Sequence, residues 1–303
     1  MIGGDERGAA LAVVVASNRS LGLLRACLGS LVPQCEANDA LLIVVRAVDA
    51  EFEQLRGDFP GVMWIDAGAG DDIPRLRGRG LAASRAVLTA LTEDHCVAAP
   101  DWLSRVALHA GDHVDVIGGG MGNLRPRAID WGAYFSEYGF FDAARPDAAG
   151  TADGVPLLTG ANVTYRDSVR ATVAEWMLAG AWENTVHGQL MDNGYQLSFD
   201  RSMIVSQNRM YSFGDFCRDR FEHGFDYART RTRDSSFAAR AARAAVTPLL
   251  PLVLTWRVAA AAGRGHALDF TRALPATIAF LTAWSVGEAA GYLSGNAPQR
   301  QIS

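Results

Sequence analysis

Three consecutive side chains that can bind a metal ion, Glu93, Asp94 and His95, stand one residue after the apolar run 86–91. A carboxylate at the C-terminal end of a strand in an open α/β sheet lies at the crevice where ligands bind. A Glu with a His two residues later offers oxygen and imidazole ligands. These residues indicate a metal-assisted binding site. The alternative is an acidic turn that only caps the next helix, because such turns are common in loops.

Three arginines lie among prolines and glycines shortly before these residues. Arg75, Arg77 and Arg79 fall within the segment 74–80. Guanidinium groups match phosphate oxygens, so arginines beside a carboxylate–metal edge suit a diphosphate. All 28 basic residues of the chain are arginines, which excludes a P-loop lysine and a Schiff-base lysine. The alternative is a basic loop in solvent, because a run of charge is often only surface.

The segments around these residues alternate between buried strands and helices. Apolar runs at 11–16, 41–45 and 61–65 are typical of buried parallel strands. A helix is expected from Leu21, with leucines at spacings of three and four, and it should end before Pro33. This order of elements predicts an α/β fold with a doubly wound, mostly parallel sheet.

The C-terminal ends of parallel strands meet at one edge of such a sheet. Ser17, Arg46, Asp66 and Glu93 each stand at the end of an expected strand. We therefore expect these four side chains to line a crevice of nucleotide size.

The composition limits the class of protein. A chain of 303 residues with 49% hydrophobic and 20% charged residues excludes disorder and allows one large α/β domain with an appendage. A net charge of −5 argues against general nucleic-acid binding. The four cysteines form no C-x-x-C pair and indicate reduced thiols in a cytoplasmic protein, with a Cys27–Cys35 bridge left open. No secretory signal is expected in residues 1–10.

Three further segments follow in the middle of the chain. Residues 115–120 predict a strand that opens into a glycine turn. The aromatic-dense segment 131–141, around Glu137, is compatible with sugar stacking at an acceptor site, although a helical core stripe is the more common meaning of such spacing. The Pro/Gly/Asp-rich segment 143–154 has the composition of a loop and is a candidate lid.

Two strongly apolar stretches, 244–262 and 274–286, follow an arginine-rich segment near the end of the chain. Pro248 and Pro251 interrupt the first, and the second is shorter than a bilayer requires. This pattern favours helices that lie in the membrane interface or form a re-entrant pair. The alternative is a soluble helical subdomain or a dimer interface.

Five short motifs occur in order between residues 10 and 230, and they are listed here as they stand: Val14-Val15-Ala16-Ser17-Asn18-Arg19; Arg77 with Gly80; Glu93-Asp94-His95; Gly160-Ala161-Asn162-Val163-Thr164-Tyr165-Arg166; and Trp182-Glu183. This succession resembles the family 2 inverting glycosyltransferases, which carry the GT-A fold and use nucleotide-diphospho-sugars. The resemblance lies in the order and spacing of the motifs, because no single one is specific.

The resemblance implies a role for each matching residue. The implied roles are Glu183 as the catalytic base that deprotonates the acceptor hydroxyl, Arg77 on the diphosphate, Glu93 and His95 on Mg²⁺ or Mn²⁺, Asp94 at the ribose or at a metal-bound water, Ser17 and Asn18 in the donor site, and Asn162 and Trp182 on the acceptor side. His187, one helical turn after Glu183, either orients the base or belongs to the core.

Three positions depart from the pattern of the family. Arg46 stands where the second strand usually ends in an Asp that reads the nucleobase, and Asp49 is a possible substitute. His95 replaces the last Asp of the metal motif, and Gln207 lies where many members have a metal-binding His. These departures keep open a rival function, a protein that binds a sugar nucleotide or a partner without turnover. Nucleotidyl transfer is disfavoured, because the chain lacks an early glycine-rich phosphate loop with a Lys.

The sequence as a whole therefore predicts an inverting glycosyltransferase of glycan or polysaccharide synthesis. Residues 1–230 should form the GT-A-like domain and residues 231–303 a helical module that associates with the membrane. The expected partners are a nucleotide-diphospho-sugar donor, a lipid-linked or glycan acceptor and anionic lipids, without nucleic acid. The expected location is the cytoplasmic face of the cell membrane, as a peripheral or monotopic protein.

Overall fold

A computed structural model describes most of the chain, namely residues 9–47, 50–68, 70–144, 151–152, 155–156, 158–232, 235–262 and 265–294. Packing divides the chain into two units, an α/β unit of Met1–Leu124, Phe141–Ala143 and Asp147–Arg209 and a helical unit of Arg125–Phe140, Ala144–Pro146 and Met210–Ser303. Residues 210–230 group with the helices, whereas the sequence-based boundary at residue 230 placed them with the α/β domain. That the two units are separate domains stays a prediction.

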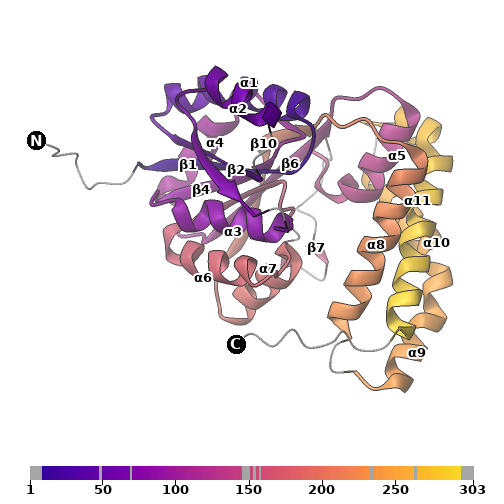
Figure 1. The fold of residues 1–303 in the computed structure, drawn as a ribbon. Coiled ribbons are helices and arrows are strands. Elements are labelled where there is room, and N and C mark those ends of the chain that lie inside the picture. Colours follow the sequence, from indigo (N-terminus) through magenta and orange to yellow (C-terminus); the bar gives the residue numbers. More distant parts are fainter. Residues whose placement is uncertain are drawn as a thin grey trace, which may run out of the picture. The chain divides into compact units, whose positions relative to one another are not determined.

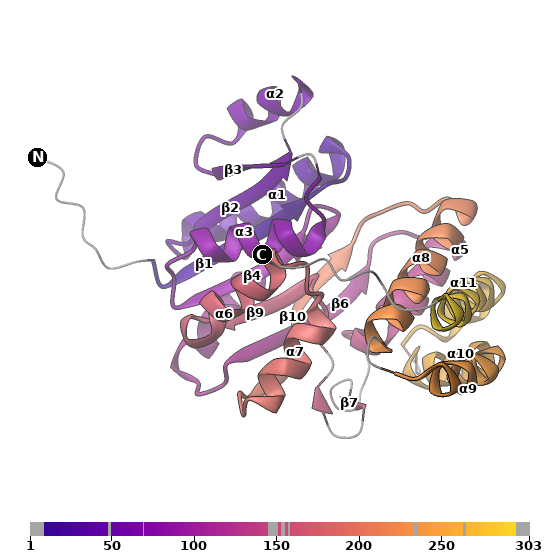
Figure 2. The ribbon, with the colours of Figure 1, turned by 60° about the horizontal axis from the view of Figure 1, so that its bottom comes forward.

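The described part of the α/β unit contains an eight-stranded sheet in the order β3-β2-β1-β4-β9-β6-β10-β5 (Figure 2). Its strands are β1 (Leu11–Ser17), β2 (Leu41–Ala47), β3 (Met63–Ala67), β4 (Leu88–Glu93), β5 (Cys96–Ala98), β6 (Val116–Asn123), β9 (Asn162–Arg166) and β10 (Leu197–Gln207). The first four strands are parallel, and β9 runs antiparallel to β4 and β6. The predicted fold, a mostly parallel α/β sheet, is confirmed. A separate small hairpin joins β7 (Thr151–Ala152) to β8 (Val155–Pro156).

Helices cover both faces of this sheet, with α1, α2 and α4 on one face and α3, α6 and α7 on the other (Figure 1). Their bounds are α1 (Leu21–Ala37), α2 (Ala50–Asp58), α3 (Ile73–Ala83), α4 (Trp102–Leu108), α6 (Asp167–Leu178) and α7 (Glu183–Asp192), with a 3-10 turn η1 (His109–Gly111) after α4. All seven residues of β1 are buried, as expected for a central parallel strand that is covered on both faces. The core therefore fills both spaces between sheet and helices.

Helix α1 continues past Pro33 to Ala37, so the prediction that it ends before the proline was wrong. Tertiary contacts hold the last turn in place. The Gln34 amide donates to the Ala99 carbonyl at 3.0 Å and accepts from the Leu103 N–H at 3.0 Å, and Cys35 is buried. These contacts compensate for the intrahelical hydrogen bond that a proline cannot make.

The arginine-rich segment 74–80 belongs to α3, so the alternative of a basic loop in solvent does not hold. Asp72 caps the helix by accepting from the Arg75 N–H at 3.1 Å. The glycines serve close packing, because a Cβ on Gly80 would lie 2.2 Å from Val14 and a Cβ on Gly78 would lie 2.9 Å from Leu178. Helix α3 can therefore lie directly against β1 and α6.

Strand β6 runs through the glycines at 118–120, where a turn was predicted. A Cβ on Gly118 would meet Leu158 at 2.3 Å, and one on Gly119 would meet the Met203 carbonyl at 2.4 Å. The glycines reflect this close approach beside the irregular register between β6 and β10, not a change in chain direction.

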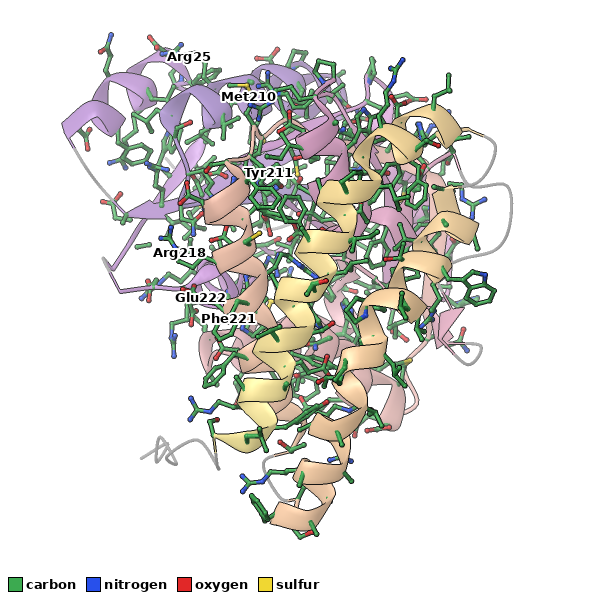
Figure 3. The ribbon with its side chains drawn as sticks, turned by 90° about the vertical axis from the view of Figure 1, so that its right-hand side faces the viewer. Arg25, Met210, Tyr211, Arg218, Phe221 and Glu222 are labelled. Carbon is green, nitrogen blue, oxygen red and sulfur yellow. The ribbon has the colours of Figure 1, made fainter. Side chains whose placement is uncertain are left out.

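In the helical unit the described helices are α5 (Ala128–Glu137), η2 (Gly139–Phe141), α8 (Phe213–Arg231), α9 (Phe237–Val246), η3 (Thr247–Leu249), α10 (Leu250–Ala262) and α11 (Ala267–Leu293). Figure 3 views α8 and α11 side by side, with the exposed Arg218, Phe221 and Glu222 along α8. The aromatic residues of α5 form core contacts, such as the edge-to-face pair Phe135–Phe270. The helical core stripe, not a sugar platform, is thus the meaning of that spacing.

The two apolar C-terminal stretches behave differently. The second lies in α11, where Phe280 and Leu281 are buried. The first covers η3 and α10, and it leaves Leu249, Leu252, Val253 and Trp256 exposed. Among the described residues, Phe237–Ala260 is a candidate membrane span by length and composition, and only 6% of its window is buried.

Candidate active site

The predicted strand ends do meet at one edge of the sheet. Ser17 pairs in register with Arg46, and Arg46 pairs with Asp66 on the next strand. On the other side of β1, Ala16 pairs with Glu93. The sequence cluster at Glu93 therefore lies beside the loop that follows β1.

Asp94 holds the loop between β1 and α1. Its Oδ2 accepts hydrogen bonds from Ser17 Oγ at 2.9 Å, the Asn18 N–H at 2.9 Å and the Arg19 N–H at 2.6 Å. Ser17, Asn18 and Asp94 thus come together as predicted, but Asp94 is buried and anchors the loop, so its contact with a ribose stays a prediction.

Arg46 completes this loop anchor. Its Nη1 donates to Ser17 Oγ at 2.9 Å and to the Arg19 carbonyl at 2.7 Å, and it lies 3.9 Å from Asp94 Oδ2. The residue that departs from the family pattern is therefore the counter-charge of Asp94. Asp49, the suggested substitute for base recognition, lies outside the described residues.

Arg77 is a buried charge of the site, with 2% of its surface exposed. Its Nη1 donates to Glu183 Oε2 at 2.8 Å, and its Nη2 donates to Glu93 Oε1. Burial disfavours its charge, but the two carboxylates outweigh this and raise the pKa of the guanidinium. In this structure the Arg77 guanidinium binds the two carboxylates, and its contact with a diphosphate stays a prediction.

Gly160 closes over the guanidinium of Arg77. A Cβ at this position would lie 2.3 Å from Nη1, 2.4 Å from Cζ and 2.5 Å from Nη2. Only glycine leaves the space in which Arg77 lies between the carboxylates. The resembled motif contained this glycine, but sequence alone gave no sign that its partner is Arg77.

Glu183 begins α7, directly after the exposed Trp182. Burial raises the pKa of its carboxyl, but the Arg77 guanidinium outweighs this and holds the pKa below its usual value. A carboxylate in the first turn of a helix also interacts favourably with the helix dipole. Glu183 is therefore ionised at neutral pH and partly exposed, as a group that accepts a proton must be.

A buried pair joins β9 to α7, the helix that begins at Glu183. Tyr165 Oη and His187 Nε2 are 2.8 Å apart, and both side chains are buried. Burial lowers the pKa of His187 to about 4, so the imidazole is neutral at neutral pH. The pair belongs to the packed support of α7, in agreement with the core role that the sequence left open for His187.

Asn162 is a structural link in this structure. Its Oδ1 accepts from Trp102 Nε1 at 3.0 Å, and its Nδ2 donates to the carbonyls of Gly120 at 2.9 Å and Met203 at 2.7 Å. These bonds join β9 to β6, β10 and α4. The side chain of Asn162 is fully buried, whereas Trp182 is accessible, and the acceptor-side role of both residues stays a prediction.

The oxygen atoms predicted to bind a divalent metal are engaged by the protein itself. Glu93 Oε1 accepts from Arg77, Glu93 Oε2 lies 3.3 Å from His95 Nδ1, and Asp94 Oδ1 lies 3.8 Å from the same nitrogen. Gln207, which stands where many members of the resembled family have a metal-binding His, is buried and donates to Asn123 Oδ1 at 2.7 Å. Across the described part of the chain, no group of three or more His, Cys, Asp or Glu side chains is arranged to hold a metal ion.

His95 adds to this mismatch. Burial lowers the pKa of its imidazole, but the side chains of Cys96, Asp94 and Glu93 outweigh burial and raise that pKa well above its usual value. A metal ligand must be the neutral ring, so a metal would compete with the proton that these side chains favour. Because Glu93 Oε1 binds Arg77 and Asp94 Oδ2 binds the β1 loop, the residues as arranged here do not fit a divalent cation.

The comparisons with known proteins bear on the fold. No protein-family model matches the chain, and no curated protein matches it at the level of sequence. Among solved structures, the chain is similar to the mannosyltransferase PcManGT from Pyrobaculum calidifontis in complex with GDP-Man and Mn²⁺. The TM-score is 0.53 at 15% sequence identity, and the match covers 93% of this chain and 88% of that chain. At this identity the likeness shows the fold alone, which this chain shares with that mannosyltransferase.

Proposed function

We propose that this protein is a glycosyltransferase that moves a sugar from a nucleotide-diphospho-sugar to a hydroxyl acceptor with inversion at the anomeric carbon. The observation that carries the proposal is the bridge Glu183–Arg77–Glu93. It brings a partly exposed carboxylate from the start of α7 to the strand end where an open α/β sheet binds its ligand.

Glu183 is the group that accepts the proton in this reaction. The acceptor hydroxyl oxygen forms a bond to the anomeric carbon, the bond from that carbon to the diphosphate oxygen breaks, and the hydroxyl proton passes to the Glu183 carboxylate. Its lowered pKa keeps the carboxylate ionised, and so ready to take that proton, at neutral pH. The exposed ring of Trp182 offers an apolar face on which a sugar can pack. Both side chains thus support an acceptor subsite at the start of α7.

The donor subsite in this proposal is the loop after β1. Ser17, Asn18 and Arg19 are fixed there by Asp94, and a loop whose backbone is held in one conformation loses little entropy when it binds a nucleotide. No step of the proposed reaction passes through a metal ion, because the oxygen atoms of Glu93 and Asp94 are engaged by protein groups.

The proposed acceptor is lipid-linked, and the proposed location is the cytoplasmic face of the cell membrane. The support is an exposed apolar stripe on η3 and α10, formed by Leu249, Leu252, Val253 and Trp256 at helical spacing. Large apolar side chains that stay exposed along one helix face mark a surface for a membrane or a protein partner. Arg240 and Arg243 on the preceding helix suit anionic headgroups.

The decisive experiment replaces the base. Glu183→Gln should lower sugar transfer by about 10²–10⁴-fold, which is the usual contribution of a general base. Binding of the nucleotide-sugar donor should stay nearly unchanged, because the donor subsite lies on the β1 loop. The matched control is Glu175→Gln on α6, an exposed glutamate for which wild-type transfer is expected. A Glu183→Gln protein that transfers at the wild-type rate would reject Glu183 as the base.

A second candidate function is a protein that binds a sugar nucleotide without turnover. It is favoured by one observation, that Arg77 and Asp94 are committed to contacts within the protein. Hydrolysis of the donor distinguishes the two candidates. An enzyme releases free sugar slowly when no acceptor is present, whereas a binding protein retains the intact donor.

A further inference from the structure

Each carboxylate at the strand-end edge is already matched by a cation of the chain. Glu93 and Glu183 share Arg77, and Asp94 lies beside Arg46. An acidic cluster attracts a divalent cation when its negative charge is uncompensated. Here three carboxylates are paired with two guanidinium groups, so most of their negative charge is compensated without an added ion.

We infer that Arg77 is a built-in counter-ion that takes the place of a divalent metal, so that a nucleoside diphosphate binds at this edge without one. The inference rests on the proposed function in one respect only, that the ligand of the edge is a nucleoside diphosphate.

The geometry of Arg77 resembles a metal bridge in what it connects. A metal ion would join acidic side chains from separate segments, and the guanidinium of Arg77 joins Glu93 at the end of β4 to Glu183 at the start of α7. Its planar fork satisfies both carboxylates at once, which an ammonium group could not do in the same way. The two acids are therefore held in position without an ion.

Arg77 is also fixed in this position. The side chain is 2% exposed, and Gly160 lies against the guanidinium so closely that a Cβ would be 2.3 Å from Nη1. A cation that shared the two carboxylates would have to displace a buried arginine that has no open space to enter on the Gly160 side. The bridge therefore keeps Glu93 Oε1 and Glu183 Oε2 on the guanidinium and away from a shared metal position.

The second acid of the motif has one of its two oxygens committed to the loop. Asp94 Oδ2 accepts three hydrogen bonds from the β1 loop, and two of them come from backbone N–H groups. Using this oxygen for a metal would leave those donors without an acceptor, which is costly. The loop anchor therefore leaves only Oδ1 of Asp94 for a metal.

The first test uses Mn²⁺ alone as the probe and thermal unfolding as the readout. The Tm of the wild-type protein should be the same in Mn²⁺ and in chelator. Arg77→Gln removes the counter-ion and leaves Glu93 and Glu183 uncompensated, so Mn²⁺ should raise the Tm of this variant and chelator should reverse the gain. The matched control is Arg79→Gln on the same helix, which loses only an exposed bond to Asp71 and should not respond to Mn²⁺. A wild-type protein that Mn²⁺ stabilises would overturn the inference.

The second test does not depend on a variant that folds. GDP and UDP are titrated into the wild-type protein by calorimetry, once in chelator and once in Mn²⁺. The dissociation constant of the diphosphate that binds should agree between the two conditions within about twofold, whereas a loss of about tenfold or more in chelator would overturn the inference. If neither diphosphate binds in either condition, the proposed function fails, and the Mn²⁺ response of Arg77→Gln alone still decides the role of Arg77.

Discussion

Arg77 and Gly160 act as one unit at the scale of single residues. A buried arginine is tolerable only when its charge is paired and its donors are used, and Arg77 meets both conditions through Glu93 and Glu183. The pairing requires a guanidinium placed to within a few tenths of an ångström. Gly160 provides that placement because it has no side chain.

Gly160→Ala should therefore destabilise the α/β unit. The added methyl would overlap three atoms of a guanidinium that cannot retreat without breaking two ion pairs. Overpacking of this kind typically costs about 1–3 kcal/mol, and urea unfolding would measure it. The matched control is Gly188→Ala in the middle of α7, where a Cβ meets nothing within 4 Å. The control should be neutral or stabilising by up to about 1 kcal/mol, and an equal loss in both variants would contradict the role of Gly160.

His187 should make the stability of the protein fall in mild acid. Its pKa is about 4 when folded and 6.5 when unfolded, so the unfolded chain binds the proton first as the pH drops. The stabilisation is complete above pH 6.5 and is lost towards pH 4. One pKa unit corresponds to about 1.4 kcal/mol, so the advantage of wild type over His187→Gln should shrink by about 2 kcal/mol between pH 7 and pH 5.

His109 provides the control of opposite sign. Burial lowers the pKa of its imidazole, but its bonds to Asp112 and Asp200 outweigh burial, and the pKa of the folded protein is raised. Its stabilisation is present below pH 6.5 and is lost as the pH rises, so the comparison with His109→Gln should change in the other direction. Urea unfolding of the three proteins at several pH values measures both slopes. If the free energy of unfolding of wild type and of His187→Gln fell equally in acid, the lowered pKa of His187 would be contradicted.

The sequence predicted which residues meet at the site better than it predicted what they bind. Ser17, Arg46 and Glu93 could be placed at one edge because strand order follows from apolar runs that end in polar residues. The partners of Arg77 could not be predicted, because no helix was predicted for its segment and the direction of a side chain depends on tertiary packing. For the same reason a metal was predicted at Glu93, where the structure has the guanidinium of Arg77.

At the scale of elements, α8 and α11 pack with almost no space between their backbones. A Cβ on Gly287 would lie 2.0 Å from the Phe221 carbonyl, and one on Gly291 would lie 2.4 Å from the Phe225 carbonyl. Gly224 makes the reciprocal approach to the Trp284 carbonyl at 2.3 Å. Small residues at such spacings allow close packing of two helix backbones, as they also do in membranes. This contact explains why α8 groups with the helices.

Gly287→Ala should disrupt the close contact between the α8 and α11 backbones. The methyl would meet a backbone carbonyl that cannot rotate away as a side chain could, so the loss should reach the upper part of the usual overpacking range, about 3 kcal/mol. The control is Gly214→Ala near the start of α8, where a Cβ has nothing within 4 Å. Limited proteolysis and helical circular dichroism during heating would follow the helical unit. Equal melting temperatures of the two variants would show that the α8–α11 contact does not require glycine at position 287.

At the scale of the whole chain, the apolar surface is distributed unevenly. The sequence could identify the second apolar stretch as helical, but periodicity alone could not show that it lies in the core while the first stretch is exposed. Single exposed apolar side chains are normal on a protein surface. The exposed stripe is different because it brings four of them together, namely Leu249, Leu252, Val253 and Trp256. Only 6% of the apolar window in Phe237–Ala260 is buried, whereas the core helix of a soluble protein is mostly buried.

The stripe should determine attachment of the protein to anionic membranes. Leu252 and Trp256 are 73% and 72% exposed, and a full transfer of such side chains out of water is worth about 1.5–3 kcal/mol each. The double variant Leu252→Ser/Trp256→Ser should therefore bind phosphatidylglycerol vesicles at least about tenfold more weakly than wild type, even if insertion is partial. The control is Leu108→Ser in α4, a leucine that is 79% exposed on the α/β unit and should bind as wild type does. Arginines near an anionic surface add about 1 kcal/mol each, so salt should weaken the attachment without abolishing it. Co-sedimentation at low and high salt measures both contributions. Two outcomes would refute the membrane role of the stripe: a double variant that sediments with vesicles as wild type does, or a wild type that stays unbound at low salt.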